Sequence, residues 1–360
     1  MNRVEAIARE VYGPDAAVPY AVRLTGGASR ETWALDVVVP GGDRHELVLR
    51  LDGPGAALEA GTGLAEEARL MRAAAEAGVP VPHVVAAGPP TNPPAEPPAQ
   101  QPTGPHARSY AGSYAGSHAG PYAGPYAGPY AGPYVLMSRI PGETIPRRIL
   151  RDEAYREARP KLAAQCGRAL AAIHRMPLSC LPETASAPQA VPADPLRRWR
   201  DVLDLTGQPH PVFELALRRL AADRPPAAPA AVVHGDFRNG NLIVGPEGVR
   251  AVLDWELAHA GDPLEDLGWL CVKAWRFGSP LPVGGFGGYA ELTAAYEEAG
   301  GRPVDLDALR WWETFGVLKW GIICVMQTMR HLRGGASSVE LAALGRRACQ
   351  NEWDLLGLLT

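Results

Sequence analysis

The sequence predicts an α+β fold in which a smaller N-terminal lobe, built on an antiparallel sheet, precedes a larger helical C-terminal lobe. Strand-like runs separated by short turns fill residues 21–51. From about residue 150 onward, apolar residues recur mainly at helical spacing. The chain has 360 residues, of which 46% are hydrophobic, enough to bury a core in both lobes. We therefore place the N-terminal lobe in residues 1–140 and the C-terminal lobe in residues 141–360.

The N-terminal lobe begins with a helix whose apolar residues Val4, Ile7, Ala8 and Val11 share one face. Strands are expected at 21–27, 31–39 and 45–51, and the Gly-rich turn at 40–43 makes the second and third a hairpin. A helix at 64–77 ends at Gly78, and a further strand follows within 79–88.

Residues 89–133 break this pattern. Their first half is rich in Pro and Ala, and their second half repeats four-residue units of the kind SYAG and PYAG. Such a segment has little apolar surface to bury, so we interpret it as a disordered insertion. A Tyr-rich interaction segment is the alternative. The fold resumes with a strand and turn at 134–143.

Helical patterns dominate the C-terminal lobe. Two short apolar strands, 242–244 and 249–255, interrupt them. Trp311, Trp312 and Trp320 lie at helical spacing, which is typical of core residues. We assign no role to His174. The helices are expected at 157–175, 196–206, 211–223, 264–276, 288–300, 305–331 and 338–359.

Composition argues against several classes of protein. A net charge of -4 favours neither nucleic acid nor an anionic membrane as the partner. The five cysteines form no C-x-x-C pair, so we expect buried, reduced thiols and no zinc site. The first residues lack the apolar core of a signal peptide, and the most apolar stretch, 312–329, is interrupted by charges. We therefore expect a cytoplasmic protein, whose oligomeric state the sequence leaves open.

The segment VVHGDFRNGNLIV (232–244), followed by AVLDWELAHAGDP (251–263), carries the chemistry. Phosphoryl transfer needs a carboxylate to orient the attacking hydroxyl, oxygen ligands for Mg²⁺, and positive charge near the transferred group. Asp236 follows a short apolar strand and supplies the carboxylate that orients the hydroxyl. Asn241 and Asp254 offer amide and carboxylate oxygens for Mg²⁺. Arg238 can offset charge on the γ-phosphoryl group, so we name Asp236 and Arg238 as catalytic candidates.

His234, Asp236 and Asn241 meet the spacing H-x-D-x-x-x-x-N of the protein-kinase catalytic loop, although D-W-E replaces D-F-G. Together with LDWELAHAGDPLEDLGWL and TFGVLKWGIICVMQ, the segment HGDFRNGNLI resembles the aminoglycoside-phosphotransferase family of small-molecule kinases. The branch linked to acyl-CoA dehydrogenases is the most similar. We interpret His234 itself as a buried residue that shapes the loop.

The resemblance covers nearly the whole chain outside 89–133 and implies a protein-kinase-like two-lobed fold. It also implies that Asp236 is the catalytic base, that Asn241 and Asp254 bind Mg²⁺, and that Asp266 braces the catalytic loop. ATP or GTP is the implied co-substrate, and a small-molecule hydroxyl is the implied acceptor.

The nucleotide is expected to bind the N-terminal lobe. Gly27, Ser29 and Arg30 belong to a loop between two strands, where backbone N–H groups can meet phosphates. Met137 and Arg139 are expected to form the hinge beside the base through backbone groups.

Arg50 and Glu67 take the positions where the family has a phosphate-binding lysine and its glutamate partner. No lysine occurs before Lys161, and only Lys273 and Lys319 follow it, whereas the chain has 32 arginines. A planar guanidinium and a point-charge ammonium approach oxygen differently, so we interpret Arg50 as a variant of this site.

Three functions remain open from the sequence. The first is a kinase of a hydroxylated metabolite, for which the similar branch suggests a hydroxyacyl-CoA or a related acyl compound. The second is an antibiotic kinase acting on an aminoglycoside or a macrolide. The third is a nucleotide-binding pseudokinase scaffold, for which the missing lysine is the argument.

Overall fold

The computed structural model describes residues 2–24, 30–52, 63–88, 132–182, 194–335 and 338–359. It forms two compact units, of which the first contains Met1–Arg69 and His83–Arg139 and the second contains Leu70–Pro82 and Ile140–Thr360. Gly27, Ser29 and residues 89–131 of the predicted insertion lie outside the described residues.

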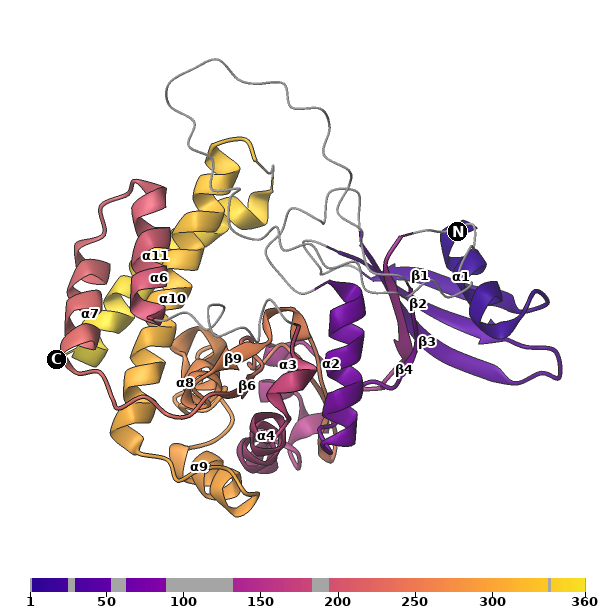
Figure 1. Ribbon diagram of the computed structural model, residues 1–360, viewed down its shortest axis with the longest axis horizontal. Coiled ribbons are helices and arrows are strands. Elements are labelled where there is room, and N and C mark those ends of the chain that lie inside the picture. Colours follow the sequence, from indigo (N-terminus) through magenta and orange to yellow (C-terminus); the bar gives the residue numbers. More distant parts are fainter. Residues whose placement is uncertain are drawn as a thin grey trace. The chain divides into compact units, whose positions relative to one another are not determined.

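A five-stranded antiparallel sheet forms the first unit, in the order β1-β2-β3-β5-β4 (Figure 1). The predicted hairpin pairs β2 with β3 from Arg30↔Asp52 to Val38↔Arg44. Gly41 and Gly42 in its turn have φ of 112° and 94°, a conformation that favours glycine. The strands are β1 (Ala17–Leu24), β2 (Arg30–Val38), β3 (Arg44–Asp52), β4 (Val84–Ala87) and β5 (Tyr134–Ser138).

Helix α1 (Asn2–Tyr12) packs against this sheet. Its residues Val4, Ile7 and Ala8 are buried in one cluster with Leu35 of β2 and Leu49 of β3. The helical spacing of the apolar residues therefore produced the expected core face. Helix α2 (Leu64–Glu76) spans the boundary of the two units, which falls after Arg69.

The second unit is mainly helical, with two small antiparallel pairs, β6 with β9 and β7 with β8. The α+β prediction is therefore confirmed. Its strands are β6 (Ala231–Val233), β7 (Leu242–Gly245), β8 (Gly248–Val252) and β9 (His259–Gly261). Its helices are α3 (Pro146–Arg151), α4 (Arg159–His174), α6 (Pro195–Thr206), α7 (Pro211–Ala222), α8 (Leu264–Cys271), α9 (Tyr289–Glu298), α10 (Leu306–Leu332) and α11 (Val339–Leu359).

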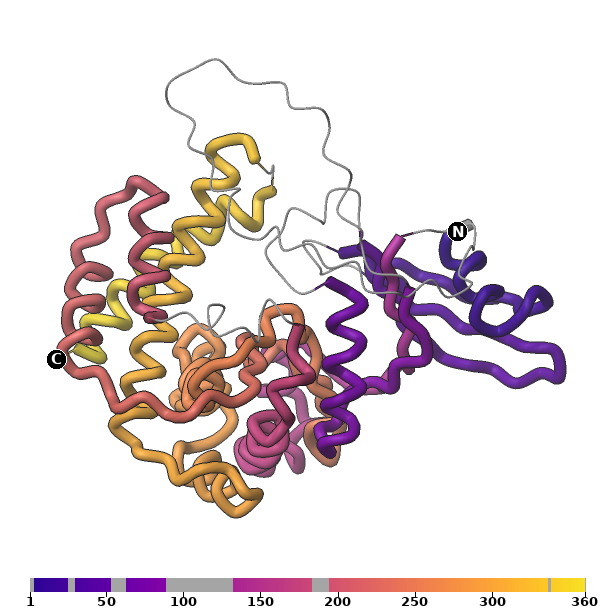
Figure 2. Tube along the Cα trace, viewed as in Figure 1, coloured from indigo at the N-terminus to yellow at the C-terminus, as the bar shows by residue number. Residues whose placement is uncertain are grey.

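Helix α10 is the centre of the second unit. Helices α6, α7, α8 and α11 all pack on it, and Figures 1 and 2 show α6, α7 and α11 gathered beside it. Its 27 residues are apolar almost all round because neighbours cover several of its faces. Trp311 and Trp312 are buried in this core, as predicted, and Trp320 packs against it.

Some local predictions differ from the structure. The helix expected over 264–276 ends at Cys271 and is followed by a short 3-10 turn, Lys273–Arg276. Neither α3 nor the three-residue strand β9 was predicted, because such short elements show no clear periodicity. Four cysteines are buried and free, but Cys349 is exposed on α11.

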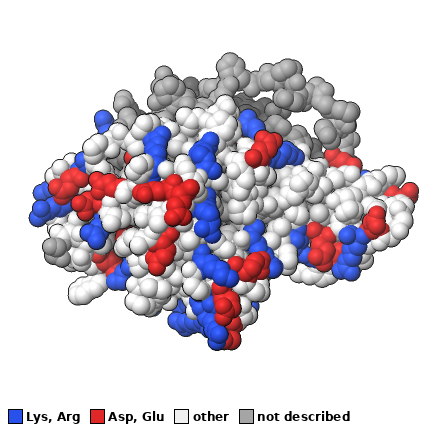
Figure 3. Space-filling view, turned by 90° about the horizontal axis from the view of Figure 1, so that it is seen from below, with Lys and Arg blue, Asp and Glu red and all other residues white. Residues whose placement is uncertain are grey.

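The charged side chains on the surface are of both signs. Acidic and basic side chains are interspersed on the face that Figure 3 shows, and neither sign covers it alone. Among the described helices, none is both long and apolar enough to cross a bilayer.

Candidate active site

The loop that carries Asp236 is anchored on both sides by strands of the second unit. All three residues of β6 are buried, and β6 pairs with β9 from Ala231↔Gly261 to Val233↔His259. On the other side, β7 pairs with β8. The intervening residues, 234–241, form what we call the catalytic loop. Because both ends are tied to buried strands, this loop has a defined path.

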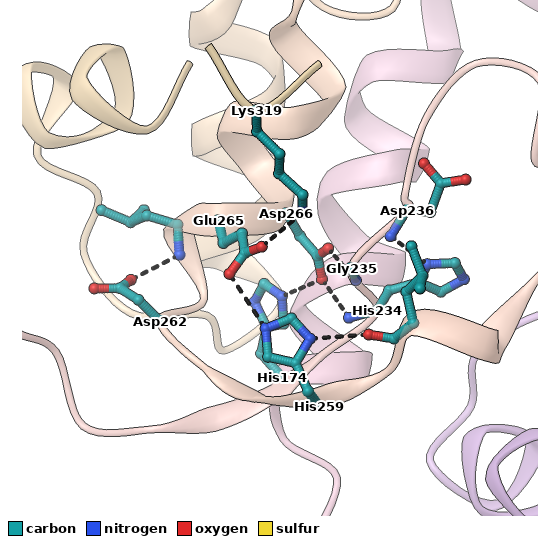
Figure 4. A network of polar contacts seen from close by, with 11 residues as sticks. His174, His234, Gly235, Asp236, His259, Asp262, Glu265, Asp266 and Lys319 are labelled. Carbon is teal, nitrogen blue, oxygen red and sulfur yellow. Dashed lines mark hydrogen bonds and ion pairs between the residues drawn. The ribbon is translucent and has the colours of Figure 1, made fainter. Parts of the chain in front are cut away.

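Asp266, at the start of α8, holds the catalytic loop through hydrogen bonds to its backbone. Its Oδ2 accepts from the backbone N–H of His234 at 2.7 Å, and its Oδ1 accepts from that of Gly235 at 2.9 Å (Figure 4). His174 of α4 forms a hydrogen bond through Nε2 with the same carboxylate at 3.2 Å and another through Nδ1 with the Tyr296 hydroxyl at 2.9 Å. The histidine to which we gave no role therefore belongs to this brace.

The carboxylate of Asp266 is fully buried, and its hydrogen-bond donors offset the free-energy cost of removing the charge from water. Burial alone would raise the pKa of Asp266, but the hydrogen bond from His174 and the nearby His234 outweigh it and hold the pKa below its ordinary value. The group is therefore an anion at neutral pH and a strong acceptor for the two loop amides.

Glycine is required at position 235. Its φ is +82°, and a Cβ atom there would lie 2.5 Å from the backbone oxygen of Leu257. Both the backbone conformation and the close approach exclude a side chain. The turn at Gly235 brings the next residue, Asp236, out of the strand direction.

Three side chains donate to the carboxylate of Asp236. Arg238 Nε lies 3.0 Å from Oδ1 and 3.2 Å from Oδ2, and Asn241 Nδ2 lies 2.6 Å from Oδ2. Trp269 of α8 donates its indole N–H to Oδ1 at 2.8 Å. Sequence reasoning missed Trp269, although it lies in the DLGWL segment that carried the family resemblance. The Asp236 side chain keeps 15% of its surface exposed, so another group can still reach it.

Hairpin β7–β8 brings the two predicted metal ligands together. Asn241 directly precedes β7, and Leu253 N donates to its carbonyl oxygen at 2.9 Å. Asp254 follows at the end of β8 with a φ of 68°, in the left-handed region that is unusual for a residue other than glycine. Observed backbone strain of this kind is common at functional sites.

The donor set at this point fits Mg²⁺. Asn241 uses its amide nitrogen on Asp236, which leaves its oxygen for another partner, and Asp254 contributes a carboxylate. Mg²⁺ is commonly held by one or two protein oxygens together with nucleotide phosphates and water. Within the described ranges, no cluster of three or more His, Cys, Asp or Glu side chains could hold a metal unaided.

His234 is a structural member of the catalytic loop. It is fully buried, and burial holds its pKa below the ordinary value despite the surrounding carboxylates. The neutral ring donates from Nε2 to the backbone oxygen of Leu253 at 3.1 Å, while Nδ1 accepts from Asp236 N at 3.3 Å. It thereby links the catalytic loop to the end of β8, in line with our interpretation from the sequence.

In the first unit, two arginines converge on one glutamate. Glu67 of α2 is 1% exposed and accepts from Arg50 through Oε1 and from Arg30 through Oε2, the latter at 2.6 Å. Arg30 Nε also lies 3.2 Å from Asp52, its cross-strand partner in the β2–β3 register. The sequence indicated the Arg50–Glu67 pair, but did not indicate that Arg30 shares it.

The two residues expected at the hinge lie on and just after β5. Met137 is buried and pairs with Val48 of β3. The side chain of Arg139 forms ion pairs with Asp36 and Glu46, both at 2.8 Å. The backbone N–H of Arg139 also donates to the backbone oxygen of Glu46 at 3.0 Å, so the hinge role of Arg139 stays a prediction.

A second charged cluster lies against the ring of Trp269. Lys319 Nζ is 3.0 Å from Glu265 Oε1 and 4.7 Å from the centre of the Trp269 ring. His259 Nε2 meets the other oxygen of Glu265 at 3.3 Å (Figure 4). Burial would raise the pKa of Glu265, yet Lys319 and His259 hold it far below its ordinary value. The Glu265 carboxylate is therefore ionised, and its negative charge is balanced by Lys319 and His259.

The chain belongs to the phosphotransferase enzyme family, whose sequence profile matches residues 21–312. It is accordingly a small-molecule kinase that transfers a phosphoryl group to a hydroxyl.

Among curated proteins, acyl-CoA dehydrogenase family member 10 of Mus musculus is 41% identical over 75 residues, which is 20% of this chain and 7% of the relative. Family member 11 of Gallus gallus is 54% identical over 41 residues, which is 11% of this chain and 5% of the relative. The chain thus spans less than a tenth of the length of these relatives.

Solved structures share the fold over nearly the full length. A Ralstonia eutropha JMP134 protein assigned as an aminoglycoside phosphotransferase has a TM-score of 0.63 at 21% identity, with 99% of this chain and 98% of that chain covered. A macrolide 2′-phosphotransferase of Brachybacterium faecium has a TM-score of 0.58 at 18% identity, with 97% of each chain covered. At such identities the likeness defines the fold and leaves the acceptor open.

Proposed function

We propose that the protein transfers the γ-phosphoryl group of ATP or GTP to the hydroxyl of an acyl metabolite, such as a hydroxyacyl-CoA, with Mg²⁺ as the metal. The observation that carries the proposal is the carboxylate of Asp236, held by three donors on a braced loop and still partly exposed. The reaction places few covalent demands on a protein, so positioning and charge compensation are its main tasks.

In the proposed mechanism, Asp236 accepts a hydrogen bond from the acceptor hydroxyl and so directs its oxygen toward the γ-phosphorus. As the new O–P bond forms and the bond to the β-phosphate oxygen breaks, the hydroxyl proton passes to Asp236 and the nucleoside diphosphate leaves. Arg238 offsets negative charge on the transferred group. Asn241 and Asp254 would hold Mg²⁺, which neutralises phosphate charge when bound.

The first unit contributes the nucleotide-binding groups in this proposal. Arg50 takes the place of the family's lysine and contacts phosphate oxygens, and Glu67 fixes its guanidinium. Arg30 pairs with the same glutamate and with Asp52, so we propose that it reaches the phosphates only by leaving one of these carboxylates. Gly27 and Ser29 are proposed to supply loop N–H groups, and Met137 and Arg139 backbone contacts to the base.

The charges around the catalytic loop favour an uncharged or anionic acceptor over a polycation. Glu265 is paired with Lys319 and His259, and Glu313 is paired with Arg276 and Tyr289. An aminoglycoside would need unpaired carboxylates to replace the water around its ammonium groups. These nearby carboxylates already have partners, and Arg238 adds positive charge. The short matches to acyl-CoA dehydrogenase family members support the same acceptor class.

Labelled γ-phosphate transfer from Mg²⁺-ATP, and separately from Mg²⁺-GTP, to hydroxyacyl-CoAs, aminoglycosides and macrolides tests the proposal. We expect a phosphorylated hydroxyacyl product, and a loss of roughly 10²–10⁴-fold in turnover for Asp236→Asn. Asp201→Asn, an exposed position on α6, is the matched control and should retain full turnover. Transfer to an antibiotic alone would contradict the acceptor class, and absence of nucleotide binding would contradict the kinase function and favour a scaffold.

A further inference from the structure

Trp269 differs from the other two donors to Asp236 in its origin. Arg238 and Asn241 belong to the same catalytic loop as Asp236, two and five residues further on. Trp269 lies 33 residues away in sequence, on α8, and donates to Oδ1 at 2.8 Å. Its indole therefore ties the carboxylate to the helical core and not merely to the loop.

The two loop donors also have second duties under the function proposed above, on which this inference rests. Arg238 is required at the γ-phosphate, and the amide of Asn241 at the metal. An indole N–H can only donate one hydrogen bond, and it cannot accept a proton. Trp269 can hold Asp236 throughout the reaction without competing for the proton of the acceptor.

Close helix packing fixes the position of the indole. Trp269 is 4% exposed, and α8 lies tightly against α10. A Cβ atom on Gly268 would lie 2.6 Å from the backbone of Trp312, and one on Gly316 would lie 2.6 Å from Val272. Glycines on both facing helices thus permit an approach that a larger residue would prevent. The backbone that carries the indole is therefore held close against α10.

A buried ammonium group lies against the face of the same indole. Lys319 Nζ is 4.7 Å from the ring centre, its side chain is 9% exposed, and Glu265 neutralises it at 3.0 Å. A cation over an indole face is attracted to the ring, more strongly where water is excluded. It also draws electron density from the ring, which makes the N–H a better donor to Asp236.

We propose that Trp269 is the positioning residue for the catalytic base Asp236, and that Lys319, paired with Glu265, supports the indole from the face of its ring. The carboxylate then keeps one orientation when Arg238 turns to the phosphate. Loss of the indole N–H should therefore slow the chemical step and leave nucleotide binding unchanged.

The test compares Trp269→Phe with Trp311→Phe in the full-length protein. Both residues are buried in the same core, and Trp311 donates its N–H to the backbone oxygen of Leu220 at 2.9 Å. Each variant loses one buried hydrogen bond and a similar volume, so both should lose similar thermal stability. We expect Trp269→Phe to lower kcat by about 10- to 100-fold with the KM for nucleotide unchanged, whereas Trp311→Phe keeps the wild-type kcat.

A second readout is independent of turnover. With ¹⁵N-labelled tryptophan, the indole N–H resonance of Trp269 is identified by its absence in Trp269→Phe. It should shift upfield in Asp236→Ala, which removes the acceptor, while the Trp311 resonance stays in place.

The outcomes separate this inference from the function on which it rests. Suppose that Asp236→Asn is inactive and that Trp269→Phe, measured separately, has the same kcat as Trp311→Phe. That pair of results would overturn the positioning role of Trp269 alone. A Trp269 indole resonance that does not shift in Asp236→Ala would also overturn the positioning role. Full activity of Asp236→Asn would instead overturn the proposed catalytic base.

Discussion

Replacing Asp266 by asparagine tests the brace under the catalytic loop. The carboxylate is fully buried and accepts from two backbone N–H groups and His174 at 2.7–3.2 Å. Asparagine keeps one acceptor oxygen, but its NH₂ group replaces the other oxygen. That NH₂ group faces a hydrogen-bond donor and cannot accept from it. At least one hydrogen bond to a charged group is lost, worth about 1.5–3 kcal/mol, and a buried donor is left without an acceptor. We therefore expect a loss of about 3–5 kcal/mol in the free energy of unfolding.

Urea unfolding followed by tryptophan fluorescence suits this measurement. Eight of the nine tryptophans lie in the second unit, since Trp33 alone belongs to the first. The exposed Asp201→Asn on α6 is the control for the change of charge, and should alter the free energy of unfolding by less than about 0.5 kcal/mol. A value for Asp266→Asn within about 1 kcal/mol of the wild type would refute the argument that Asp266 holds the loop.

The pH dependence of this difference provides a second check. The pKa of Asp266 is lowered in the folded protein. The carboxylate therefore contributes its full share to the free energy of unfolding above the ordinary pKa of 3.8, and this share is lost as the pH falls through the lower pKa of the folded state. The difference in melting temperature between wild type and Asp266→Asn should thus stay constant from pH 7 to about pH 5 and shrink in more acidic buffer. A difference that grows on acidification would contradict this assignment.

Three further predictions follow from the site. Arg50→Ala should raise the KM for nucleotide about 10- to 100-fold in steady-state kinetics, with partial recovery in Arg50→Lys, and an unchanged KM would exclude Arg50 from the phosphate site. Gly235→Ala should lower the melting temperature and kcat, because φ is +82° and a backbone oxygen lies 2.5 Å from the new Cβ; Gly207→Ala, with φ +67° but no atom within 4 Å, should lose less stability and retain kcat. Burial lowers the pKa of His259, but Glu265 raises it further, so His259 should stabilise the fold most below its ordinary pKa of 6.5. The difference in melting temperature between wild type and His259→Asn should shrink as the pH rises past that value, and a growing difference would contradict the pairing.

Most of the fold could be predicted because its long elements have clear periodicity. The hairpin β2–β3 followed from two strand-like runs around a Gly-rich turn, and α10 from a long helical pattern without Pro. Short elements such as β9 could not be predicted, because three residues contain little more than one alternation and β9 exists only by pairing with β6.

The loop residues of the candidate site could be predicted because their spacing is local, whereas their supports could not. Asp236, Asn241 and Asp254 lie within one strand–loop–hairpin segment. His174 and Trp269 reach the loop from α4 and α8, which requires the packing of those helices to be known. A helical pattern shows that Trp269 faces a core, but not that its N–H meets a carboxylate. The second arginine on Glu67 was missed for the same reason, because Arg30 reaches that glutamate from another strand.

The crowding at Asp236 has a consequence for the order of events. A carboxylate offers about four positions for donors, and Arg238, Asn241 and Trp269 already occupy most of them. Arg238 takes the largest share because its Nε contacts both oxygens. An acceptor hydroxyl can therefore donate to Asp236 most readily once Arg238 has turned to a phosphate. Under the proposed mechanism, nucleotide binding would therefore open the position that the acceptor needs, and the indole of Trp269 would keep the carboxylate in place while Arg238 contacts the phosphate.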